Sequence, residues 1–199
     1  MSTGDYESAV MEFLRQPENL ETALEIAERV QDLKVRLILD FWRTLRDKIR
    51  GERDLPGWCF ELDTEMYKAA HWSGLTLQPA LKGELYLRLA LVQEPKGLRA
   101  GVVWNKENRE DLGTFSEKYP ELKGLLKCLA EWEPAVKPST WWLSFSYVHP
   151  HPILDRRTLV SISNETLVAP VAREYVRWID KFSGLLKRVN DQLSGAPVE

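Results

Sequence analysis

The chain of 199 residues has little cysteine, with only Cys59 and Cys128, and no apolar run approaches the roughly 20 residues of a membrane-spanning helix. Its first residues also lack the basic and apolar parts of a signal peptide. Two distant cysteines in such a chain favour reduced thiols over a disulfide. We therefore expect a cytoplasmic protein without a membrane segment.

Neither sign of charge is in large excess, because 27 Lys and Arg stand against 30 Asp and Glu, for a formal charge of -3. This balance argues against broad contact with a phosphate backbone. The sequence also lacks the glycine-rich phosphate loops, paired zinc ligands, calcium loop and serine-hydrolase elbow that mark common enzymes. We expect no cofactor, and what is missing favours a protein without catalytic activity, although it does not decide the point.

The sequence does contain enough apolar residues for one folded domain, at 44% hydrophobic and 29% charged. A first helix is predicted over residues 5–15 and a second over 18–50, where apolar residues recur every three to four positions. The second helix is acidic at its start and basic at its end, as the helix dipole favours. Its length of roughly 50 Å at 1.5 Å per residue exceeds a small domain, so we expect a kink or break near Asp32.

The middle of the chain changes to short runs bounded by turn residues, which predict strands. We expect strands over residues 58–62, 74–81, 83–93, 97–104 and 140–148, a helix over 109–131 with a break at Pro120, and a last helix over 167–193. This order predicts an α+β fold: N-terminal helices, a mostly antiparallel sheet of four to five strands and a long C-terminal helix packed on it. The expected segments are helical residues 1–50, an α+β domain over 51–193 that forms one compact unit with the helices, and a flexible tail over 194–199.

Aromatic and basic residues offer the first candidate binding surface. Trp141 and Trp142 are adjacent in a predicted strand, so one ring is expected to enter the core and the other to lie on the opposite face. That second ring either packs beneath a helix or belongs to an exposed patch that binds a protein or a base. The basic candidates for the same surface are Arg43, Arg46, Arg156 and Arg157, which are otherwise ordinary solvated charges.

A polar cluster offers a second, catalytic hypothesis. His149 and His151 are two residues apart, with Asp155 close behind, so in an extended segment both imidazoles could meet one metal ion or phosphate. The prolines between them equally predict a rigid loop. Glu94 and Lys96 form an E-x-K string of the kind found in nucleases, with Asp63 as a possible upstream acid, but we expect them in a turn.

Four segments together resemble a known family. They are residues 41–46 (FWRTLR), 72–77 (WSGLTL), 98–102 (LRAGV) and the pair at 141–142 (WW). Over about residues 30–190 the chain resembles the C-terminal accessory region of bacterial proteins of the PD-(D/E)XK nuclease superfamily. In those proteins the nuclease core precedes this region, so the resemblance implies an accessory module without the catalytic core and transfers no catalytic residue.

Two functions remain open at this point. The first is a non-catalytic binding or regulatory module in bacterial or phage nucleic-acid metabolism, with another protein as the expected partner and nucleic acid as the other possibility. The second is a small metal-dependent nuclease or phosphodiesterase that uses the cluster of His149, His151 and Asp155. The oligomeric state is left undetermined.

Overall fold

The computed structural model describes residues 3–63, 74–80, 83–94, 96–150 and 155–195. Its elements in chain order are α1 (Thr3–Leu14), α2 (Pro17–Glu52), β1 (Trp58–Leu62), β2 (Gly74–Pro79), β3 (Leu87–Glu94), β4 (Gly97–Trp104), α3 (Leu112–Lys118), α4 (Pro120–Trp132), β5 (Trp142–His149), α5 (Arg156–Ser163) and α6 (Val168–Leu193). The predicted α+β class, with its antiparallel sheet and long C-terminal helix, is confirmed.

The five strands form one antiparallel sheet in which each strand pairs with the next one in the sequence, in the order β1-β2-β3-β4-β5. The hairpin between β3 and β4 is tight, since Glu94 pairs with Gly97. Gly97 has a φ of 145° and a Cβ there would lie 2.1 Å from the His149 carbonyl oxygen, so only glycine fits this turn. The chain therefore reverses direction between Glu94 and Gly97, as predicted.

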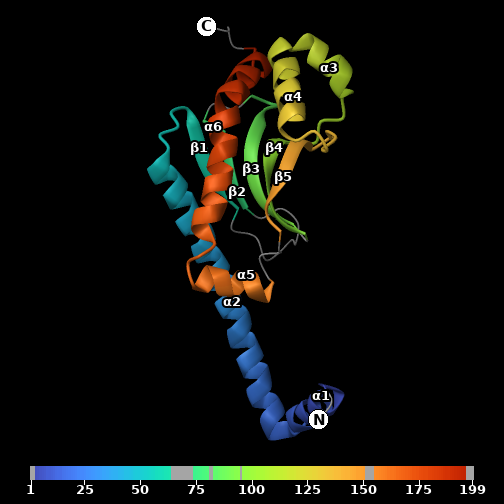
Figure 1. Cartoon of the computed structure of the whole chain (residues 1–199), viewed down its shortest axis with the longest axis vertical. Helices are drawn as coiled ribbons and strands as arrows, with labels where there is room; N and C mark the ends of the chain where they lie inside the picture. Colours follow the sequence, from blue (N-terminus) through green and yellow to red (C-terminus); the bar gives the residue numbers. More distant parts are fainter. Residues whose placement is uncertain (1–2, 64–73, 81–82, 95, 151–154, 196–199) are drawn as a thin grey trace.

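Helices cover one face of the sheet, which we call the covered face (Figure 1). The leucines at 87, 89 and 91 of β3 point into this core, to which α6 contributes three large aromatic side chains, Tyr175, Trp178 and Phe182. Trp178 of α6 lies 5.2 Å from Phe182 and 6.1 Å from the Trp132 ring of α4, measured between ring centroids. The hydroxyl of Tyr175 donates to the Leu89 carbonyl oxygen at 3.0 Å, which ties α6 to the centre of the sheet.

Helix α2 is a single unbroken helix of 36 residues, so the predicted kink near Asp32 is wrong. No proline or glycine lies between Pro17 and Gly51, and without such a residue the backbone hydrogen bonds continue through Asp32. The second half of α2 packs against the sheet and α6 through Ile38, Phe41, Trp42, Leu45 and Ile49. The first half projects beyond the sheet together with α1 (Figure 1).

Two of the shorter helical regions can be compared with the prediction. The helical region after β4 is divided at Pro120 into α3 and α4, as predicted. Helix α5 was not predicted: it is short, and it begins where the Asp155 carboxylate accepts from the Arg157 amide at 2.8 Å.

Within the described residues no helix is long and apolar enough to cross a membrane. Of the expected tail over 194–199, Ser194 is the C-cap residue of α6, and residues 196–199 lie outside the described residues.

Candidate functional site

The second face of the sheet, here called the open face, carries a different set of side chains. Alternation along β3 turns Arg88, Ala90 and Val92 away from the core leucines. Ala90 and Val92 join Val103 and Trp142 in a small apolar cluster, against which Phe145 packs. All of these residues come from strands, so within the described part of the chain no helix contributes to this cluster.

A hollow of about 490 Å³ opens on this face. Its described lining residues are Glu61, Leu62, Asp63, Gly74, Thr76, Arg88, Ala90, Val92, Val103, Trp141 and Trp142. Apolar side chains of β3 and β4 form the floor of the hollow. The carboxylates of Glu61 and Asp63 lie on the side of β1, and the two indole rings lie on the side of β5. Such a mixture of an apolar surface with few polar groups is typical of ligand sites.

Arg88 is the cation of this hollow. Its Nε atom is buried without a hydrogen-bond partner, and its guanidinium forms no ion pair with another described residue. The nearby carboxylate of Glu61 accepts instead from Gln78 Nε2 at 2.6 Å, and the Gln78 side-chain oxygen accepts from the Tyr86 hydroxyl at 3.2 Å. Arg88 therefore keeps donors for a carboxylate or another oxygen acceptor, which a guanidinium binds through paired N–H groups.

Arg99, on the neighbouring strand, also has a buried Nε atom without a hydrogen-bond partner, but unlike Arg88 it forms an ion pair. It pairs with Glu94, and both side chains are largely buried. Its guanidinium carbon lies 4.3 Å from the Trp142 ring centroid and 4.2 Å from that of Phe145, which is cation–π distance. Burial lowers the pKa of Arg99, while the nearby Tyr147 acts in the opposite direction. Arg99 is thus engaged within the protein and fixes the Trp142 ring beside the hollow.

The two tryptophans do not divide between the faces, so that prediction is wrong. Strand β5 begins only at Trp142, and the Trp141 carbonyl oxygen accepts from the Trp104 amide at 2.9 Å in the segment before it. Because Trp141 precedes the strand, the alternation rule does not apply to it, and both residues line the same hollow. Trp142 is 4% exposed and Trp141 is 38% exposed, so they form a fixed and an accessible aromatic surface.

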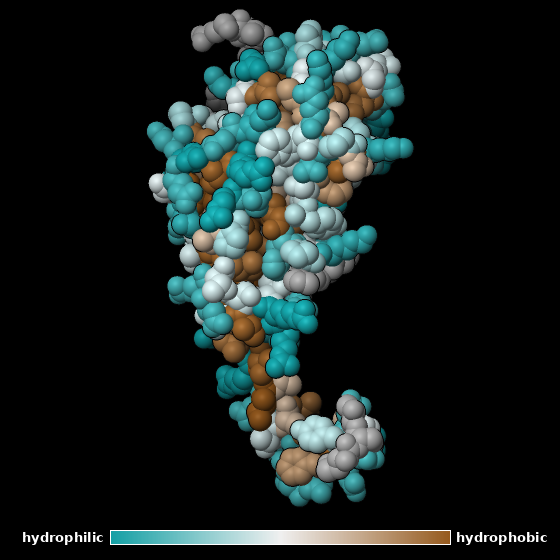
Figure 2. All heavy atoms as spheres, in the orientation of Figure 1, coloured by the Kyte–Doolittle hydropathy of each residue, from teal (hydrophilic) through white to brown (hydrophobic). Residues whose placement is uncertain are grey.

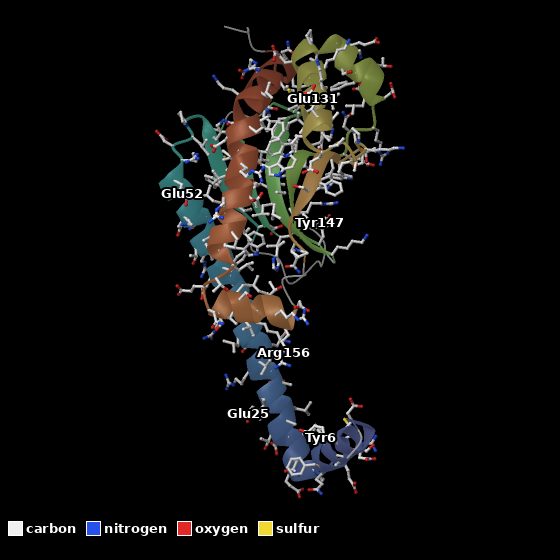
Figure 3. All side chains as sticks on the ribbon, viewed as in Figure 1. Tyr6, Glu25, Glu52, Glu131, Tyr147 and Arg156 are labelled. Carbon is white, nitrogen blue, oxygen red and sulfur yellow. The ribbon has the colours of Figure 1, made fainter. Side chains whose placement is uncertain are left out.

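The four predicted basic residues lie elsewhere. Arg43 and Arg46 are on α2, where they contact Asp40 at 3.4 Å and Asp47 at 2.8 Å. The hydrogen bond from Arg46 lowers the pKa of Asp47. Arg156 and Arg157 begin α5, and Figure 3 shows Arg156 beyond the end of the sheet where α5 crosses α2. None of these four arginines is among the residues that line the hollow, so the structure does not bring them to the tryptophans.

The predicted catalytic cluster is described only in part. His149 Nε2 lies 3.2 Å from the Thr158 hydroxyl, and the Asp155 carboxylate caps α5. His151 lies outside the described residues. Among the described residues no group of three or more His, Cys, Asp or Glu is placed to hold a metal ion. Catalysis by this cluster stays a prediction.

Sequence reasoning missed Arg88 and Glu61 as site residues. Alternation along residues 84–91 places Arg88 on the side of the strand opposite the leucines, where an arginine is usually solvated. The available signal was that Ala90 and Val92 follow Arg88 on that same side, so the outer face is itself partly apolar. An arginine beside apolar outward positions indicates a surface that is not simply solvated.

Comparison of the chain with models of protein families, with curated proteins and with solved structures found no match. The resemblance to the PD-(D/E)XK accessory region therefore stays a prediction that these comparisons do not support. The side chains that line the hollow therefore provide the evidence for what the chain binds.

Proposed function

We propose that this protein is a non-catalytic recognition module that binds a segment of a partner polypeptide on the open face of its sheet. The observation that carries the proposal is Arg88, a half-buried guanidinium without an ion-pair partner among the described residues, in a hollow that also holds Trp141 and Trp142. A charge held out of water lowers stability unless a binding partner compensates it. A carboxylate on the ligand would supply that compensation.

The ligand chemistry follows from the residues around Arg88. An acidic side chain or a C-terminal carboxylate would pair with the guanidinium through two hydrogen bonds. An aromatic or large aliphatic residue beside it would pack on the accessible ring of Trp141 and on Val92. A short acidic and aromatic peptide combines both groups, and tryptophan and arginine are the residue types that most often dominate binding energy at protein interfaces.

Nucleic acid fits the same surface less well. Glu61 and Asp63 line the hollow and would repel phosphates, while the charge of Arg99 is neutralised by Glu94. A single cation gives little affinity for a phosphate backbone, because that affinity grows with the number of phosphates neutralised. The balance of charges therefore favours a polypeptide over DNA or RNA.

The test is selection of random peptides displayed on phage against the full chain. We expect the selected peptides to combine an acidic residue with an aromatic or aliphatic one, and to bind the Arg88→Gln and Trp141→Ala variants at least about tenfold more weakly, since such anchors contribute more than about 1.4 kcal/mol. The matched control is Arg46→Gln, an arginine on α2 outside the hollow, which should bind as the wild type does.

Two outcomes would overturn this proposal. Selected peptides that bind all three variants equally would place recognition on another surface. Tight binding of labelled single-stranded DNA or RNA, with cleavage when Mg²⁺ or Mn²⁺ is added, would instead favour the nuclease hypothesis, and His149→Ala would then be the first variant to examine.

A further inference from the structure

The projecting arm, defined as α1 with residues 17–33 of α2, carries most of the exposed large hydrophobic side chains of the described residues. Of the eleven exposed large hydrophobic side chains among the described residues, eight lie in the arm: Tyr6, Met11, Phe13, Leu20, Leu24, Ile26, Val30 and Leu33. Figure 2 shows part of this surface as a brown stripe along α2 below the sheet. An exposed patch of this kind usually marks an interface.

The stripe continues along one side of α2 toward the sheet. Ile26, Val30 and Leu33 are spaced three to four residues apart, and Leu37 and Phe41 follow at the same spacing. These last two line a groove of about 450 Å³ whose other wall comes from Ile162 of α5 and Val168 of α6. The same side of α2 is therefore a ridge on the arm and one wall of a groove beside the sheet.

Charges along α2 indicate what covers this ridge. Glu18, Glu25 and Asp32 follow one another at intervals of seven residues, and so do Arg36, Arg43 and Arg50, so each set keeps to one edge of the helix. Arg36 is four residues after Asp32, which places the basic set on the same edge as the acidic set. All six side chains are exposed.

We propose that two copies of this chain associate through antiparallel α2 helices, each copy laying the arm stripe into the groove of the other. A two-fold axis at residue 34 brings Glu18, Glu25 and Asp32 of one copy beside Arg50, Arg43 and Arg36 of the second copy, respectively. In the same register Arg29 of one copy lies opposite residue 39 of the second copy, one position from its Asp40. The paired region is about 50 Å long at 1.5 Å per residue.

The same register matches the apolar residues. Leu33 of one copy lies beside Leu37 of the second copy, and Ile26 lies beside its Phe41 and Thr44, so the ridge enters the groove. A parallel pair would bring this charged edge beside the opposite edge of the second helix, so the acidic and basic sets would not meet. The existing contact between Asp40 and Arg43 is exposed, with side chains 69% and 56% accessible, and it is easily exchanged for contacts across the pair.

The experiment is sedimentation velocity of the full chain over a wide concentration range, with charge-reversed variants. We expect a concentration-dependent dimer for the wild type. Glu25→Arg and Arg43→Glu should each weaken it about tenfold, because each reversal turns two symmetry-related attractions into repulsions. The double variant restores opposite charges at both places and should recover wild-type dimerisation to within about threefold.

The matched control is Glu28→Arg, the same charge change on the same helix. Glu28 lies midway in sequence between Ile26 and Val30, which places it on the opposite side of α2 from the stripe. This variant should dimerise as the wild type does. A wild-type chain that remains a monomer at all concentrations, or a double variant that dimerises no better than the single ones, would overturn the proposal.

Discussion

The covered and open faces of the sheet are made by the same strands, because successive side chains of each strand point to opposite faces. On β3, Leu87, Leu89 and Leu91 enter the main core, while Arg88 and Ala90 turn to the other side. Each buried leucine stabilises the fold, by about 1.5–3 kcal/mol. Arg88 forms no ion pair with another described residue, and its Nε atom has no hydrogen-bond partner. The covered face therefore holds the main core, and the open face carries the side chains to which we assign recognition.

The largest difference in stability between the two faces is expected when one tryptophan on each face is replaced by alanine. Trp178→Ala on the covered face should lower the free energy of unfolding by about 3–5 kcal/mol, because it leaves a cavity beside Trp132 and Phe182. Trp141→Ala on the open face should lower it by less than about 1 kcal/mol, since the ring is accessible. Urea unfolding followed by circular dichroism measures both, and equal losses would contradict the division.

A smaller effect is expected where α6 meets the first residue of β3. The Asn190 side chain accepts from the Leu87 amide at 2.7 Å and donates to the Leu87 carbonyl oxygen at 2.9 Å. Asn190→Ala should lower the free energy of unfolding by about 2–3 kcal/mol, because it leaves two buried backbone groups unpaired. The control is the neighbouring Asp191→Ala, for which little change is expected by the same urea titration. If Asn190→Ala lowered the free energy of unfolding no more than Asp191→Ala does, this contact would not hold the helix to the sheet.

On the open face itself, the two arginines should respond in different ways. Arg99→Met removes the partner of Glu94 and the cation above Trp142 and Phe145, so we expect a loss of about 1–3 kcal/mol in the free energy of unfolding. Arg88→Met removes a charge that has no ion pair in the part of the chain that the structure describes, and it should cause no loss. Chemical unfolding of the two variants side by side checks this, and a comparable loss for both would mean that Arg88 also supports the fold.

The smallest expected effect concerns the ion pair that joins α2 to α6. The Nε and Nη2 atoms of Arg53 each donate to the Asp180 carboxylate at 2.7 Å, and these hydrogen bonds hold the pKa of Asp180 below its ordinary value. A lowered pKa means that the contribution to stability is present above the ordinary aspartate pKa and is lost as the pH falls through the folded value. Arg53→Gln should raise the pKa of Asp180 toward 3.8. A carboxyl titration by NMR that gives the same pKa in both proteins would contradict the pairing.

The elements of the fold were largely predictable because their periodicity is strong. Leucines at 85, 87, 89 and 91 indicated a strand with one core face, and Pro120 marked the division between α3 and α4. Helix α5 was missed because eight residues give too few apolar repeats to be recognised, although Asp155 is a usual N-cap residue. The prediction of a kink in α2 was wrong because it rested on the length of the helix alone.

The candidate site was predictable only in its aromatic half. Tryptophans at 141 and 142 stand out by residue type, whereas their common orientation depends on where β5 begins. Arg88 could not be singled out from other outward-facing arginines, because its lack of an ion-pair partner depends on which residues the sheet places beside it. The basic residues at 43 and 156 were grouped with the tryptophans by charge alone, and the fold places them on helices away from the hollow.

The most direct test of the account is the affinity of a selected acidic and aromatic peptide for the Arg88→Met variant, measured by isothermal titration calorimetry beside wild type. The account predicts binding at least about tenfold weaker in a protein whose unfolding free energy is not reduced, because the guanidinium serves the ligand and not the fold. Equal affinity for the two proteins would contradict the claim that the open face recognises its partner through Arg88.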